Sequence, residues 1–91
     1  MSGYIPPAIE RELRKVRDRV ESGEFSLEQA GINLTHLNFH PDIDNLTDPD
    51  VREVIEDIGP NLEVESDRHY ACQYWHEIKE LLSKVFHEHK E

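Results

Sequence analysis

Apolar side chains recur every three or four residues in four separate stretches of the chain, and this is the spacing of one face of an α-helix. The strongest stripe is the last, in which Ala71, Tyr74, Trp75, Leu81, Leu82 and Val85 each lie within about 60° of Ile78 at 100° per residue. The four stripes predict helices near Pro7–Ser22, Leu27–Asn38, Pro49–Ile58 and Asp67–His87.

Residues with strong positional preferences mark the ends of these helices. Pro7 suits a first helical turn, where its missing N–H is not needed. Ser26 followed by Gln29 fits a capping box, and Asp48 before Pro49 fits a capped start. The Gly59-Pro60 pair predicts the end of the third helix, because proline lacks the N–H that an α-helix requires.

Short connections between four amphipathic helices indicate an all-α fold, a small irregular four-helix bundle. We expect one domain over residues 1–91, with a flexible arm at residues 1–6 and a frayed tail at residues 88–91. Leu62 and Val64 alternate with acids, which suggests a short extended crossing, and Ile43 and Leu46 could plug the core from a loop. The predicted core consists of Leu13, Val16, Leu34, Leu37, Ile55, Ile58, Trp75, Ile78 and Leu82.

Charge is distributed unevenly along a chain whose net charge is −10. Residues 1–20 hold five bases and three acids, residues 21–67 hold one base and thirteen acids, and residues 68–91 hold four of each. The middle therefore carries −12, which disfavours direct binding to nucleic acid or to an anionic membrane. Concentrated like charge destabilises a compact fold, so the surface either meets a cationic partner or is simply solvated.

Ten acids and one strong base, Arg52, lie between His40 and Asp67. If this stretch docks onto a basic protein, its carboxylates are the binding groups, and a tyrosine beside them would add contact area. The predicted partner-binding residues are Asp42, Asp44, Asp48, Asp50, Glu53, Glu56, Asp57, Glu63, Glu65, Asp67 and Tyr70. Ile43 and Leu46 are further candidates for apolar contact at the rim.

Metal and enzyme chemistry have weaker support. Asp42 and Asp44 resemble the start of an EF-hand loop, but Leu46 and Thr47 stand where that loop needs a ligand and a glycine. His69, Cys72 and His76 share one helix face and are zinc-type ligands, yet that face is opposite the apolar stripe, and a fourth ligand would have to come from elsewhere, such as His36 or His40. We expect no metal, no cofactor and no catalytic residues.

Cys72 is the single cysteine, so no internal disulfide can form and a reducing compartment fits. The chain has no apolar run long enough for a membrane span, and its first residues lack a signal-peptide pattern. We therefore expect a cytoplasmic protein that is monomeric when free.

The phrase ESGEFSLEQA, Glu21–Ala30, looks like the joint between the first two helices of colicin-type immunity proteins. With its size, acidity and helical pattern, the chain resembles the small acidic immunity proteins that protect bacteria from nuclease bacteriocins and contact-dependent toxins. The Tyr-Tyr pair of the DNase immunity proteins is absent, so no binding motif is carried over. The resemblance implies a tight inhibitor of a basic nuclease domain. Phage anti-defence proteins are also short and acidic, and they occupy the nucleic-acid grooves of host enzymes.

Three functions follow as hypotheses, and the third, a small metal-binding protein that uses His69, Cys72 and His76, has less support than the other two. The first is a non-enzymatic acidic inhibitor or immunity protein, a nucleic-acid mimic that blocks a basic partner such as a nuclease toxin or another nucleic-acid-processing enzyme. The second is a helical protein–protein adaptor domain whose acidic surface only provides solubility. Acids gathered on one surface favour the first hypothesis, and acids scattered around the fold favour the second.

Overall fold

The computed structural model describes residues 3–88, which form helices and turns with no β-strand among them. The all-α fold class is therefore confirmed. In chain order the elements are α1 (Pro7–Glu21), α2 (Leu27–His36), the 3₁₀ turns η1 (Leu37–Phe39) and η2 (Ile43–Asn45), α3 (Pro49–Glu53), the π-helical turn η3 (Val54–Ile58), α4 (Gly59–Val64) and α5 (Arg68–Glu88).

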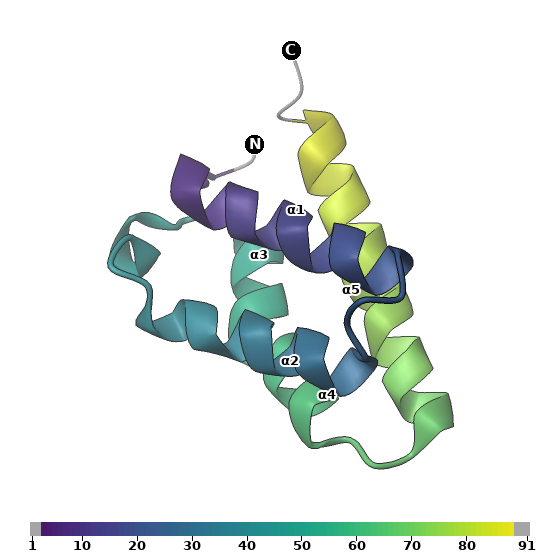
Figure 1. Ribbon diagram of the computed structural model, residues 1–91. Coiled ribbons are helices and arrows are strands. Elements are labelled where there is room, and N and C mark those ends of the chain that lie inside the picture. Colours follow the sequence, from purple (N-terminus) through teal and green to yellow (C-terminus); the bar gives the residue numbers. More distant parts are fainter. Residues whose placement is uncertain (1–2, 89–91) are drawn as a thin grey trace.

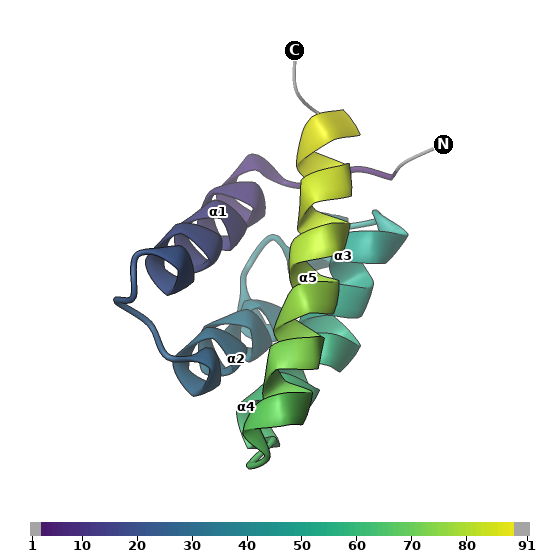
Figure 2. The same cartoon turned by 90° about the vertical axis from the view of Figure 1, so that its right-hand side faces the viewer.

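Helices α1 and α2 form an antiparallel hairpin, and α5 crosses it (Figure 1). The segments α3, η3 and α4 continue one another, and we call residues 49–64 the central helical segment. It packs against both α2 and α5, as the view turned by 90° shows (Figure 2). The bundle thus consists of four rods, with the central helical segment in contact with two of the others.

The expected helix starts and stops are present in the first hairpin. Ser26 Oγ accepts a hydrogen bond from Gln29 N at 3.1 Å, which caps α2. The capping box is not closed, because the Gln29 side chain donates to Asn33 Oδ1 at 2.7 Å instead. Gly23 has a φ of 86°, a conformation that glycine adopts without strain, and it directs the chain from α1 into α2.

The predicted end of the third helix at Gly59-Pro60 is wrong, because the chain stays helical to Val64. The preceding turn widens into a π-helix, in which the Gly59 N–H bonds the Val54 carbonyl five residues back. In that register the Ile55 carbonyl would need the N–H that Pro60 lacks. The side-chain amide of Asn38 supplies it, donating to Ile55 O at 2.9 Å and to Thr35 O at 3.0 Å.

The predicted extended crossing is therefore a short helix, α4, and Leu62 is buried in the core. Two glycines allow α2 to approach it closely. A Cβ added to Gly31 would lie 2.4 Å from Glu63 N, and one added to Gly59 would lie 2.9 Å from Leu34 Cβ. Gly31 weakens α2 as an isolated helix, but it lets the two backbones come into contact.

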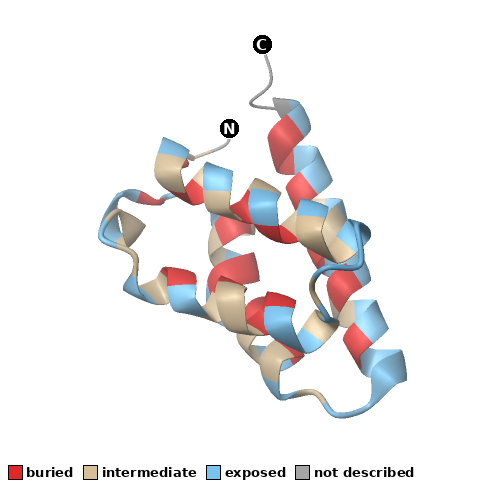
Figure 3. Ribbon diagram, viewed as in Figure 1, coloured by how far each residue is buried: buried red, intermediate tan, exposed pale blue. Residues whose placement is uncertain are grey.

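All nine residues predicted for the core are buried. Red buried positions line the inward sides of the four rods in Figure 3, and the outward sides are pale blue or tan. Leu46 is fully buried, which confirms that it plugs the core and removes it from any binding rim, while Ile43 is partly buried against the same cluster.

Residues 3–6, expected to belong to a flexible arm, are held against the loop before α3. Tyr4 N donates to Thr47 Oγ1 at 2.8 Å, Thr47 N donates to Tyr4 O at 3.0 Å, and Ile5 is buried. Residues 1–2 and most of the expected frayed tail, residues 89–91, lie outside the described residues, and α5 itself extends to Glu88. No helix in the described part of the chain is long and apolar enough to cross a membrane.

Candidate partner-binding surface

The outward face of the central helical segment is acidic. Val51, Val54, Ile55, Ile58 and Leu62 point into the core and are buried. Their helical neighbours Glu53, Glu56 and Asp57 are exposed. These three predicted residues are brought together because one helix face must carry everything that the core excludes.

Only part of this acidity is neutralised within the fold. Glu56 pairs with Arg52 one turn earlier, and Asp50 pairs with Lys84 of α5 at 3.4 Å. Arg52 also donates to the Leu46 carbonyl at 2.7 Å, so it fastens the preceding loop. Glu53 and Asp57 have no cationic partner among residues 3–88, and Asp57 accepts from Asn61 Nδ2 at 3.3 Å.

Asp48 is not available to a partner, which corrects its place among the predicted binding residues. Its side chain is 1% exposed, and Oδ1 accepts from Asp50 N at 3.0 Å and from Val51 N at 3.1 Å. Asp48 therefore caps the central helical segment. The capping signal in Asp48-Pro49 was visible in the sequence, but its burial depends on the tertiary fold.

Three further predicted acids lie where α4 leads into α5: Glu63 near the end of α4, and Glu65 and Asp67 in the turn after it. Asp67 Oδ1 accepts from His69 N at 2.8 Å and from Tyr70 N at 3.3 Å, and Asp67 N donates to Glu65 Oε2 at 3.0 Å. Asp67 is exposed while it caps α5, and Glu63 and Glu65 are partly exposed. No cation of the described chain pairs with these three carboxylates. The turn follows α4 at the lower end of the molecule in Figure 1, so these acids lie near the C-terminal end of the central helical segment.

The remaining predicted acids are set apart from these. Asp42 and Asp44 lie in the loop around η2, which precedes the Asp48 cap of the central helical segment along the chain. Asp44 is exposed and Asp42 is partly buried. The predicted set is therefore divided among the outward face of the central helical segment, the end of α4 with the turn after it, and the loop around η2.

Exposed apolar side chains accompany both acidic regions. Tyr70, a predicted contact, is 53% exposed next to the α4–α5 turn. Two exposed apolar residues were not predicted as contacts: Val64, the last residue of α4, is 78% exposed, and Phe39, before the η2 loop, is 82% exposed. Phe39 falls out of phase with the stripe of Leu34 and Leu37, and this was the signal that could have identified it.

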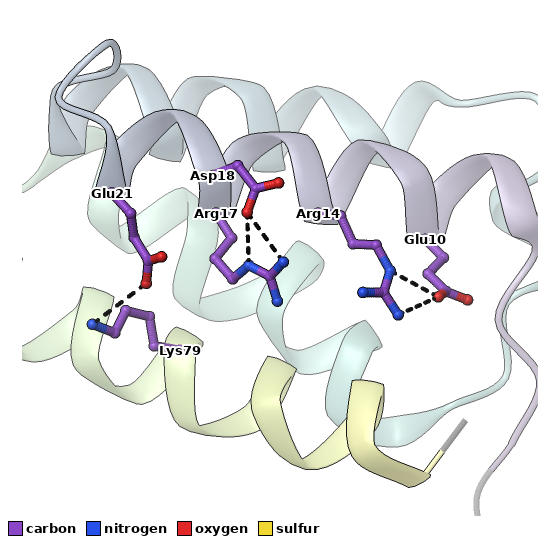
Figure 4. A network of polar contacts seen from close by, with 6 residues as sticks. All are labelled: Glu10, Arg14, Arg17, Asp18, Glu21 and Lys79. Carbon is purple, nitrogen blue, oxygen red and sulfur yellow. Dashed lines mark hydrogen bonds and ion pairs between the residues drawn. The ribbon is translucent and has the colours of Figure 1, made fainter. Parts of the chain in front are cut away.

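The charges of α1 are handled differently. Figure 4 shows three pairs: Arg14 with Glu10 at 2.8 Å, Arg17 with Asp18 at 3.1 Å, and Glu21 with Lys79 of α5 at 3.9 Å. Lys15–Glu12 and Arg19–Glu24 are further pairs in this region. Helix α1 is thus close to neutral at its surface.

His69, Cys72 and His76 are exposed on α5, around a shallow open depression whose lining residues all come from that helix. Within residues 3–88, no three or more His, Cys, Asp or Glu side chains are placed to hold a metal ion. Comparison with known proteins adds no assignment, since no family model, curated protein or solved structure matches this chain.

Proposed function

We propose that the protein is a non-enzymatic acidic inhibitor that binds and blocks a basic, nucleic-acid-processing protein. The observation that carries this proposal is the outward face of the central helical segment and the turn after it. Glu53, Asp57, Glu63, Glu65 and Asp67 have no cationic partner among the described residues. Arg52 and Lys84 pair with Glu56 and Asp50, so these five carboxylates are the acids of this region that remain for a basic partner.

The mechanism is electrostatic mimicry. Carboxylates on a rigid helix would occupy positions that nucleic-acid phosphates take in a cationic cleft, and their field would speed association. Val64 and Tyr70 at the end of the acidic surface would add apolar area, because aromatic and apolar anchors supply much of the affinity at such interfaces. The immunity-protein resemblance supports the same kind of partner.

The test is to capture the partner with three forms of the protein: the wild type, the double reversal Glu53→Lys with Asp57→Lys, and a matched control. Glu28→Lys with Glu77→Lys changes the net charge by the same amount at two exposed acids without a cationic partner in the described chain. We expect the wild type and the control to retain a basic nucleic-acid enzyme and to inhibit its activity, and the double reversal to lose both effects. Equal capture by all three forms would contradict the proposal.

A second candidate, an adaptor domain, has one observation in its favour. Val20, Phe25, Leu27, Ala71 and Trp75 line an open groove between the α1–α2 turn and the start of α5. Such a groove could hold an apolar segment of a partner. If Phe25→Asp abolished capture and the double reversal did not, the adaptor function would be the better account.

A further inference from the structure

A cleft between α1 and the C-terminal half of α5 is lined by hydrogen-bond donors. Its described lining consists of Arg14, Arg17, Ser83, Phe86 and His87, with no carboxylate among them. Arginine offers donors only, and serine and histidine can donate as well. The protein has a net charge of −10, so a cleft lined by two arginines differs in charge from the protein as a whole.

The two guanidinium groups are held in place by an aromatic ring. The Arg14 Cζ lies 4.2 Å from the centroid of Phe86, and the Arg17 Cζ lies 5.1 Å from it. Phe86 is buried beneath them. Stacking on a ring fixes the guanidinium planes before any ligand arrives, so less conformational entropy is lost on binding.

Each arginine uses one edge for its own ion pair. Arg14 donates from Nε and Nη2 to Glu10 Oε2 at 3.0 and 2.8 Å, and Arg17 donates from Nε and Nη2 to Asp18 Oδ1, both at 3.1 Å. The Nη1 group of each arginine makes no hydrogen bond with the described residues. Figure 4 shows both of these nitrogens in the space between α1 and α5.

We infer that this cleft binds a small oxyanion of the phosphate type, such as inorganic phosphate or a small phosphate ester. Guanidinium groups match the geometry of phosphate oxygens, and Ser83 and His87 would add donors from the other wall. A small ligand fits better than a nucleic acid, because Glu10, Asp18 and the strongly negative protein would repel the phosphates beyond the first.

The test is an NMR titration of the full-length protein with inorganic phosphate, at constant ionic strength set with chloride. We expect saturable amide shifts confined to residues around Ser83–His87 and to Arg14 and Arg17. Arg17→Gln should weaken binding about tenfold, since charge-assisted hydrogen bonds are the strongest available here. Arg17→Lys keeps the positive charge but loses the planar set of N–H donors of the guanidinium group, and it should weaken binding several-fold.

Arg19→Gln is the matched control. Arg19 lies on the same helix, pairs with Glu24 and stacks on Phe25 at 5.5 Å, but it does not line the cleft. It should leave phosphate binding unchanged, and equal losses from Arg17→Gln and Arg19→Gln would overturn the inference. Shifts that do not saturate, or that spread evenly over the surface, would also overturn it. Tighter binding by a single-stranded oligonucleotide than by phosphate would reject a small ligand.

Discussion

Helix α1 and the central helical segment are both amphipathic, both begin at a proline and both bury an apolar face, but the fold treats their charges in opposite ways. Pairs within α1 and with its neighbours neutralise most of its charges. On the central helical segment, Asp50 and Glu56 have cationic partners, and Glu53 and Asp57 have none among the described residues. The comparison shows that the fold pairs most of the charges of α1 and leaves part of the acidity of the central helical segment without a cation among the described residues.

The largest effects should be equal in the two regions, because both depend on the same core. Leu13 of α1 and Leu62 of α4 are almost fully buried. Leu13→Ala and Leu62→Ala should each lower the free energy of unfolding by about 2–5 kcal/mol in chemical denaturation. A cost below about 0.5 kcal/mol for Leu62→Ala would mean that the chain after Pro60 is not packed as a helix.

A smaller effect should be specific to the central helical segment. Asn38→Ala removes the amide that bonds the Ile55 carbonyl at 2.9 Å, and leaves that carbonyl without the donor that Pro60 cannot provide. The expected cost is about 1–3 kcal/mol. Pro60→Ala should recover part of it in the Asn38→Ala background, because alanine restores an N–H. If the two changes are strictly additive, the amide does not compensate for the proline.

Charge reversal should separate the two regions by the size of its effect on stability. Arg14→Glu removes the Glu10 pair and the stacking on Phe86, and should cost about 1–2 kcal/mol of stability. Glu53→Lys with Asp57→Lys should change stability by less than about 0.5 kcal/mol, since neither residue has an ion pair to lose with the described chain. Thermal melts of both variants measure the difference, and equal destabilisation would remove the contrast between the regions.

The fold was largely predictable because its signals are local. The caps at Ser26 and Asp48 and the apolar stripes depend on residues within a few turns of one another. The helical continuation past Pro60 was not predictable, because it depends on Asn38, a residue from another part of the chain. Pro60 would be expected to end the helix, and the tertiary hydrogen bond from Asn38 to the Ile55 carbonyl compensates for the N–H that this proline lacks.

The candidate site was predictable only as a region. Residue counts placed the negative charge in the middle of the chain, but they could not show that Lys84 of α5 reaches Asp50. Nor could they separate Asp48, which is buried as a cap, from the exposed Glu53. Burial and long-range ion pairs decide which acids remain available, and both require the assembled fold.

The most direct test of the central claim is the association rate constant of the captured partner, measured at low and at high salt. If the uncompensated acids guide binding, the wild-type rate should fall steeply with salt, because screening shortens the reach of the surface charge. The double reversal at Glu53 and Asp57 should bind at least about tenfold more slowly at low salt. Equal association rates for the wild type and the double reversal would contradict the account and leave this face as a solvated surface.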